Sequence, residues 1–128
     1  MEQQDDGIVV VRSDERTTGP QTPGMDRQQA FATDTLWAGF VRTEGGLVSG
    51  WHHHGGYETV IYVLDGTLRL EFGPGGAHAV EAGPGDFVRV PREIVHRESD
   101  PSPEPANVVV VRVGSGQSTF NVDGPDPA

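Results

Sequence analysis

The chain contains no cysteine, which excludes disulfide bonds and thiolate-bound metal sites. It also lacks any apolar run long enough to cross a membrane, and its first residues show neither the basic nor the apolar region of a secretory signal. Basic residues are few, with nine Lys and Arg against 19 Asp and Glu, so the formal net charge is -10. Phosphate-rich nucleic acids and anionic membrane surfaces repel such a chain, and we expect neither as a partner. These absences predict a soluble, cytoplasmic protein.

The length of 128 residues fits one ordinary domain, and 18 Gly and 10 Pro indicate many turns and few helices. Four segments are expected along the chain. Residues 1–12 form a tail with a first strand, and residues 13–35 form a loop that is a candidate lid. A barrel follows at 36–113, and a polar tail occupies 114–128. Within the loop, residues 25–33 are the one segment expected to form a short helix.

Short apolar runs separated by turn residues predict an all-β fold. The run from Glu58 to Leu64 is rich in β-branched and aromatic residues and stops at Asp65-Gly66, a pair typical of hairpin turns. The apolar residues Leu68 and Leu70 alternate with polar ones, which marks a half-buried strand. Strands at this spacing, without helices between them, favour a small barrel or sandwich over a parallel α/β fold.

Three consecutive histidines are the most distinctive feature of the sequence. In a strand, alternate residues share a face, so His52 and His54 point one way and His53 the other. Glu58 adds a carboxylate four residues later, and His96 is a distant further candidate. Imidazole and carboxylate ligands suit divalent transition metals. The alternative is an exposed histidine triplet that binds metal only weakly.

Two segments resemble the conserved motifs of the cupin superfamily. Residues 46–66 resemble the first motif, which reads Gly, five residues, His-x-His, three or four residues, Glu, six residues, Gly. Residues 85–100 resemble the second, with Pro91 and His96 at its Pro and His positions. The short spacing between the motifs is similar to that of small single-domain bacterial cupins with a type-2 conserved barrel.

The resemblance implies a double-stranded β-helix, or jelly-roll barrel, with at most one short helix. It also implies that His52, His54, Glu58 and His96 converge inside the barrel on one divalent transition metal, which would be Fe, Mn, Zn or Ni. Small cupins commonly pair, so the resemblance further implies a homodimer. The apolar segment at residues 8–11 is a candidate for the exchanged strand.

The sequence departs from the motifs at three positions. Seven residues separate Glu58 from Gly66, one more than in the pattern. In one register, Glu58 and every second residue after it point inward. In the other, Thr59 and every second residue after it point inward, Glu58 faces out, and the site has three histidines as its ligands. Because Thr is a poor metal ligand, we favour Glu58 inward. Glu93 replaces a Gly of the second motif, so its turn has to form without a positive φ or adopt another type. Asp100 replaces the closing Asn.

A metal with open coordination positions predicts an enzyme that acts on a small oxygenated organic molecule. Both a dioxygenase-type reaction and a redox-neutral isomerase, cyclase or lyase reaction fit the ligands. Glu58, Tyr57 and Tyr62 are the candidate catalytic residues. The alternatives are a non-catalytic binding or sensor protein and a protein in which the metal is only structural.

Overall fold

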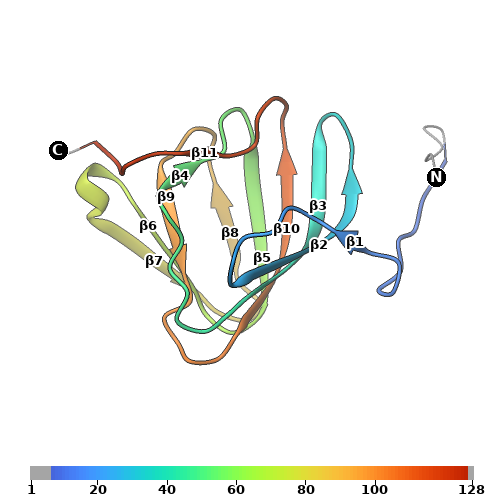
Figure 1. Ribbon diagram of the computed structural model, residues 1–128, viewed down its shortest axis with the longest axis horizontal. Helices are drawn as coiled ribbons and strands as arrows, with labels where there is room; N and C mark the ends of the chain where they lie inside the picture. The colour runs from blue at the N-terminus through green and yellow to red at the C-terminus, as the bar shows by residue number, and fades with distance from the viewer. Residues whose placement is uncertain (1–6, 127–128) are drawn as a thin grey trace.

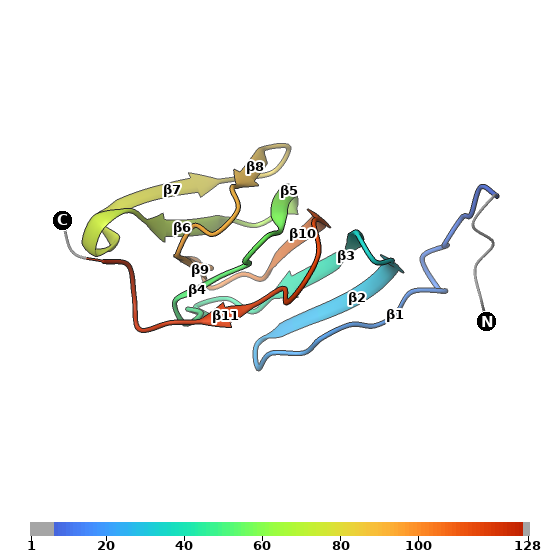
Figure 2. The same ribbon diagram turned by 90° about the horizontal axis from the view of Figure 1, so that it is seen from above.

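The computed structural model describes residues 7–126, and these residues form two antiparallel sheets that face each other (Figures 1 and 2). In order across the first sheet, the strands are β1 (Thr17–Thr18), β2 (Met25–Ala32), β3 (Leu36–Thr43), β10 (Ala106–Val113), β5 (Glu58–Asp65) and β8 (Phe87–Val90). Across the second sheet they are β11 (Phe120–Asn121), β4 (His52–His53), β9 (His96–Ser99), β6 (Leu68–Phe72) and β7 (His78–Ala82). A single 3-10 turn, η1 (Pro74–Gly76), joins β6 to β7.

From β3 onward the chain alternates between the two sheets. It passes from β3 to β4, back to β5, across to the β6–β7 hairpin, back to β8, across to β9, back to β10 and finally across to β11. This path is that of a jelly roll, and it confirms the predicted all-β double-stranded β-helix. The strands β1, β2 and β11 extend the two sheets beyond the expected barrel at 36–113.

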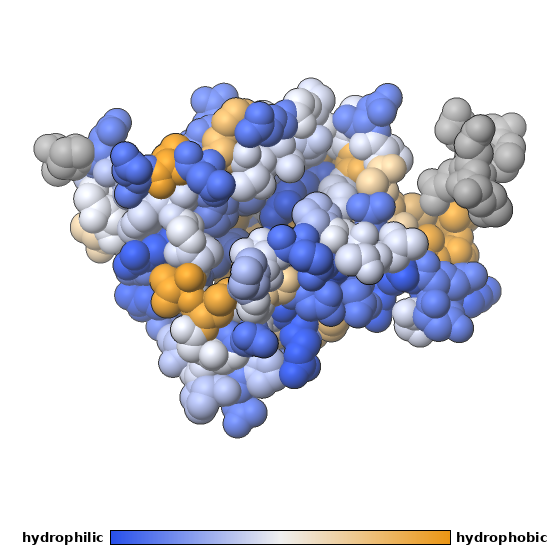
Figure 3. Space-filling model, viewed as in Figure 1, coloured by the Kyte–Doolittle hydropathy of each residue, from blue (hydrophilic) through white to orange (hydrophobic). Residues whose placement is uncertain are grey.

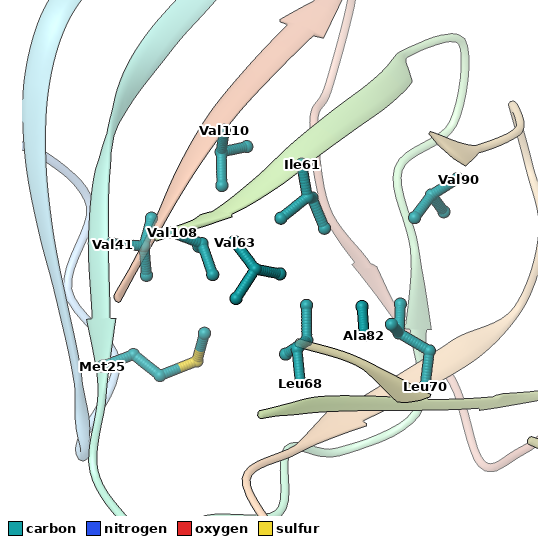
Figure 4. Packing of buried hydrophobic residues seen from close by; sticks show 10 residues of the cluster. All are labelled: Met25, Val41, Ile61, Val63, Leu68, Leu70, Ala82, Val90, Val108 and Val110. Carbon is teal, nitrogen blue, oxygen red and sulfur yellow. The ribbon is translucent and has the colours of Figure 1, made fainter. Parts of the chain in front are cut away.

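Apolar side chains from both sheets fill the space between them (Figure 4). Period-2 alternation explains which residues are inside, because in β6 the side chains of Leu68 and Leu70 are buried while Arg69 between them reaches solvent. Burying a side chain of this size contributes about 1.5–3 kcal/mol. The buried apolar cluster consists of Met25, Val41, Ile61, Val63, Leu68, Leu70, Ala82, Val90, Val108 and Val110.

The expected helix at residues 25–33 is wrong, and this segment is strand β2. It pairs antiparallel with β3 from Met25, opposite Thr43, to Ala32, opposite Trp37. The ladder with β3 supplies partners for the backbone, and Met25 points into the core. Tertiary pairing therefore overrides a weak local preference for helix. The same ladder excludes a free lid at these residues, since β2 is an integral strand of the first sheet.

The pair Asp65-Gly66 does not close a hairpin. It forms a corner where the chain leaves β5 in one sheet and enters β6 in the other. Gly66 has a φ of 82°, and a Cβ there would lie 2.6 Å from the Cα of Ala106. Glycine is required at this corner because the start of β10 packs directly against its backbone.

The two ends of the described chain behave differently. Residues 7–12 form no strand, and Ile8 is fully exposed, so the strand expected in this segment is wrong for the part that the structure describes. Figure 3 shows apolar atoms next to the grey N-terminal residues, at the edge of the molecule. The C-terminal tail instead runs along β4 toward the β6–β7 turn (Figure 2). Within residues 7–126, no helix is both long and apolar enough to span a membrane.

Candidate metal centre

Three histidines from two segments of the second sheet meet at one point. His52 lies on β4 directly opposite His96, the first residue of β9, and His54 follows β4. One ring nitrogen from each residue lies within 4.8 Å of the others. The ring centroids are 4.4 Å apart for His52 and His96, 5.0 Å for His52 and His54, and 5.1 Å for His54 and His96. The structure thus brings together the three histidines that the sequence nominated.

Backbone carbonyls fix the orientation of all three rings. The Nδ1 atom of His52 lies 2.8 Å from the Gly50 carbonyl oxygen, and Nδ1 of His96 lies 3.0 Å from that of Ile94. The Nδ1 atom of His54 lies 2.8 Å from the carbonyl oxygen of Ser118, 64 residues later. A carbonyl can only accept, so each Nδ1 carries the proton and each Nε2 keeps its lone pair. This is the tautomer in which imidazole binds a metal.

Burial keeps two of these rings neutral. It lowers the pKa of His54 to about 3, with help from the positive charge of Arg112, and it also lowers the pKa of His96. The Nε2 atom of His96 is buried and has no hydrogen-bond partner. A buried nitrogen lone pair without a donor is costly unless a cation occupies the space in front of it. Three imidazoles and no thiolate fit Zn, Fe, Ni or Cu, so the residues fit the expected divalent metal.

The expected inward position of Glu58 is wrong. Its carboxylate pairs with the guanidinium of Arg89 on the outer face of the first sheet, and its side chain is one-third exposed. The next residue, Thr59, is buried, and Ile61 and Val63 continue the inward row. The apolar residues of β5 decide the register, because facing Glu58 inward would turn Ile61 and Val63 to solvent. The ligand cluster is therefore the three-histidine alternative.

Glu98 supplies the carboxylate that Glu58 does not. It lies two residues after His96 on β9, its side chain is only 14% exposed, and its Oε1 is 3.9 Å from Nε2 of His96. Burial raises the pKa of Glu98, but the charges of His96 and His52 when they are protonated, and of the Arg112 guanidinium, outweigh it and lower the pKa overall. Glu98 is therefore ionised at neutral pH. The sequence carried a signal for it, since alternate residues of a strand share a face with His96.

A cavity of about 330 Å³ lies against the centre and is partly open to solvent. Its wall includes His52, His54, Glu98, Arg27 and Arg112, together with the tail residues Ser118, Thr119 and Asn121. The sequence analysis did not predict either arginine as a site residue. Arg112 continues the inward row of β10 that contains Val108 and Val110, so its position follows from the period of the strand.

The two candidate tyrosines lie in different places. Tyr57 lines a smaller cavity of about 110 Å³ that shares Arg27 and Arg112 with the larger one. Tyr62 lies on the outer face of β5, where its ring packs 4.8 Å from that of Phe87. Only Tyr57 is thus near the centre, and the outward position of Tyr62 excludes contact with a molecule bound there.

The C-terminal tail completes the centre. Strand β11 pairs with β4, with Phe120 opposite His53, and the two rings stack at 4.8 Å. This pairing holds the Ser118 carbonyl in place against His54. His53 points away from the cluster, as the alternation predicts. The tail is therefore part of the barrel wall and orients one of the three histidines.

A family model described as "Cupin domain" matches residues 39–112. The chain belongs to the cupin family. The matched range holds both motifs, and the histidine triad makes this a cupin equipped to bind a metal. A search of curated proteins gives no match.

Solved structures agree with the family assignment at low sequence identity. The polyketide cyclase RemF from Streptomyces resistomycificus superposes with a TM-score of 0.73 at 19% identity, covering 91% of this chain and 86% of that one. An uncharacterised double-stranded β-helix protein from Klebsiella pneumoniae superposes with a TM-score of 0.71 at 18% identity, covering 96% of this chain and 98% of that one. For the Cnp3 cupin domain of Schizosaccharomyces pombe the TM-score is 0.65 at 13% identity, covering 71% of this chain and 65% of that one. At these identities the likeness shows the fold alone.

Proposed function

We propose that this cupin is a metal-dependent enzyme that acts on a small oxygenated organic molecule. The observation that carries the proposal is the convergence of His52, His54 and His96. Two of them, His52 and His54, line a partly open cavity. A divalent cation bound there would act as a Lewis acid on a substrate oxygen and would keep coordination positions free for it. His52, His54 and His96 would hold the ion.

The geometry favours a catalytic centre over a purely structural metal. Structural sites usually surround the ion with four protein ligands and exclude solvent. Here three imidazoles converge, and the cavity of about 330 Å³ beside them reaches solvent. A small molecule can therefore reach the centre, which a structural metal would not need.

Glu98 supports a redox-neutral reaction such as isomerisation, cyclisation or elimination. Each of these moves a proton to or from carbon or oxygen, and an ionised carboxylate beside the metal can accept it. Glu98 is ionised and lines the cavity, whereas Glu58 faces the outer surface. RemF, to which the chain is similar in fold, is described as a polyketide cyclase. A dioxygenase-type reaction is the second candidate, since three imidazoles also suit iron.

Metal content tests the centre. Wild-type protein purified after growth with added metals is expected to carry about one divalent ion per chain, measured by elemental analysis. His96→Ala is expected to lose most of it, because one of three ligands is removed. His78→Ala is the matched control, since His78 is exposed on β7 at the far side of the second sheet. Wild-type protein without metal, or equal content in the two variants, would overturn the proposal.

Substrate screening tests the reaction class. The metal-loaded protein is incubated with a panel of diketones and phenols under air and under nitrogen. Product formation in both atmospheres, with no oxygen uptake at an electrode, is the result expected for a redox-neutral enzyme. Turnover that stops under nitrogen would assign the dioxygenase type instead.

A further inference from the structure

The cavity beside the metal centre has the opposite charge to the rest of the molecule. The chain carries a formal net charge of -10, and all nine of its basic residues are arginines. Two of these, Arg27 and Arg112, line the cavity together with a single carboxylate, Glu98. Two guanidinium groups and one carboxylate leave a formal charge of +1, and a divalent cation on the histidines would raise it to +3. An acidic protein with a cationic pocket is built to concentrate an anion at that place.

Arg112 has donor capacity that the described residues do not use. It comes from β10 and points inward, and its Nε is buried without a hydrogen-bond partner. The arginines on strands of the second sheet are instead satisfied by carboxylates, Arg69 by Glu81 and Arg97 by Glu71. A buried N–H without an acceptor is unfavourable, and a ligand oxygen in the cavity would satisfy it.

Arg27 is held in place by neutral oxygens. Its Nη1 donates to the Thr22 hydroxyl at 2.9 Å and to the Pro20 carbonyl at 3.3 Å. No ion pair of Arg27 or Arg112 within 4.0 Å is present among residues 7–126. Both arginines also border the smaller cavity lined by Tyr57, so they lie where the two cavities adjoin. Each guanidinium presents a planar fork of N–H donors that matches a carboxylate.

We propose that Arg27 and Arg112 form an anion-binding subsite that holds a carboxylate group of the substrate beside the metal centre. This inference rests on the proposed function and names its substrate class as small carboxylic acids with a further oxygen for the metal. His52, His54 and Glu98 line the same cavity, so the second oxygen would be within the same space as the metal centre. Inorganic phosphate shares the anionic chemistry, so it serves as a competing probe.

Calorimetric titration with lactate and lactamide tests the subsite. The two probes have nearly the same shape, and only lactate carries a carboxylate. At low ionic strength, where screening is weak, metal-loaded wild-type protein is expected to bind lactate at least tenfold more tightly than lactamide. Arg112→Gln and Arg27→Gln are each expected to weaken lactate binding at least tenfold. Arg69→Gln is the matched control and should bind like wild type, because Arg69 pairs with Glu81 on the surface.

Three results would overturn the inference. These are equal affinity for lactate and lactamide, wild-type lactate affinity in Arg112→Gln, and tighter binding of phosphate than of lactate with the same dependence on Arg112. If Arg112→Gln does not fold, Arg112→Lys keeps the charge but loses the planar fork, and it should still weaken lactate binding.

Metal analysis separates this inference from the proposed function. If Arg112→Gln keeps its metal and binds lactate as tightly as wild type, only the subsite is contradicted. A wild-type protein that carries no metal contradicts the proposed function. In that case the metal-free wild-type protein should still bind lactate, and Arg112→Gln should abolish this binding.

Discussion

Two carboxylates near the histidine triad differ in what their side chains face. Glu98 lies beside His96 and the cavity, whereas Glu58 pairs with Arg89 on the outer face of the first sheet. A carboxylate close to a bound cation stabilises it even when it is not a ligand, and such neighbours typically contribute about 10–100-fold to metal affinity. An exposed ion pair contributes about 0–1 kcal/mol to stability. The two residues therefore make a matched pair for mutation.

We expect Glu98→Gln to weaken zinc binding about tenfold or more, and Glu58→Gln to leave it within about twofold of wild type. Competition with a chromogenic chelator at constant pH measures both affinities. If Glu58→Gln weakened zinc binding as much as Glu98→Gln, the outward register of β5 would be contradicted and Glu58 would return as a ligand.

The low pKa of His54 makes the metal-free fold sensitive to acid. In the unfolded chain this imidazole takes up a proton near its ordinary pKa of 6.5, but in the folded protein only near 3. Between these values the unfolded state binds more protons, so stability falls as pH falls from 6.5 toward 3 and is fully present above 6.5. One such group contributes a slope of at most about 1.4 kcal/mol per pH unit.

Urea unfolding of metal-free protein at pH 7.5, 6 and 4.5 measures this slope. His54→Gln removes the titrating ring, so its free energy of unfolding is expected to depend less steeply on pH than that of wild type. The same slope in both proteins would show that His54 does not titrate as its burial requires.

At the scale of elements, the turn before β9 stores strain at Glu93. This residue has a φ of 62°, and its N–H donates to the Gly55 carbonyl at 3.0 Å. The expectation that this turn forms without a positive φ is therefore wrong. A side chain in this left-handed region costs about 1–2 kcal/mol.

Glu93→Gly is expected to stabilise the protein by about 1 kcal/mol, because glycine adopts this φ without a steric penalty. Gly66→Ala is the opposite case, since its φ is 82° and the added methyl would meet Ala106 at 2.6 Å. Thermal unfolding of metal-free protein should show a higher Tm for the first variant and a lower Tm for the second. An unchanged or lower Tm for Glu93→Gly would mean that the turn is not strained.

The tail after β10 is expected to control metal binding without holding the fold together. A chain cut after Gln117 loses the short strand β11 and the Ser118 carbonyl that orients His54. Both sheets keep their longer strands. We expect metal affinity to fall at least about tenfold, as for other groups that orient a ligand, with near-wild-type circular dichroism. A chain cut after Val122 keeps β11 and is the control. Equal affinity in the two truncated chains would contradict the role of Ser118.

The sequence predicted the barrel and the histidine triad because both depend on local spacing. His-x-His on a strand fixes two rings on one face, and the motif order places His96 beside them. The register of β5 was not predictable from spacing, because one residue more than the motif contains can be absorbed at several points. In the structure, the pairing of β10 with β5 shifts by one residue between Asn107, which lies opposite Asp65, and Val108, which lies opposite Val63. Burial of Ile61 and Val63 then decides which face Glu58 takes.

Strand β2 and the tail were harder to predict for a different reason. Their structure depends on partners distant in sequence, β3 for Met25–Ala32 and β4 for Phe120–Asn121. Arg27, Arg112 and Glu98 reach the cavity only because such pairings fix which face of each strand points inward. Period-2 alternation nominates these residues once the strands are known, but it does not find strand β2 itself.

At the scale of the whole molecule, the homodimer stays a prediction. Ile8 and Val10 are exposed, and the segment that carries them extends away from the body (Figure 1). Exposed apolar segments of this kind usually contact another surface, and we expect that surface to belong to a second copy. Light scattering should give twice 13.7 kDa for the full chain, and the mass of one shortened chain after removal of residues 1–12. A full chain of 13.7 kDa would contradict the dimer.

The alternation of the chain between the two sheets has a consequence for the order of assembly. Apart from the β6–β7 hairpin, successive strands from β3 to β11 belong in turn to opposite sheets, so the two sheets have to form together. Such non-local pairing makes folding slow and cooperative. His52 and His96 are far apart in the chain but lie opposite each other on β4 and β9, so we expect a metal to bind the finished barrel and not to nucleate its folding.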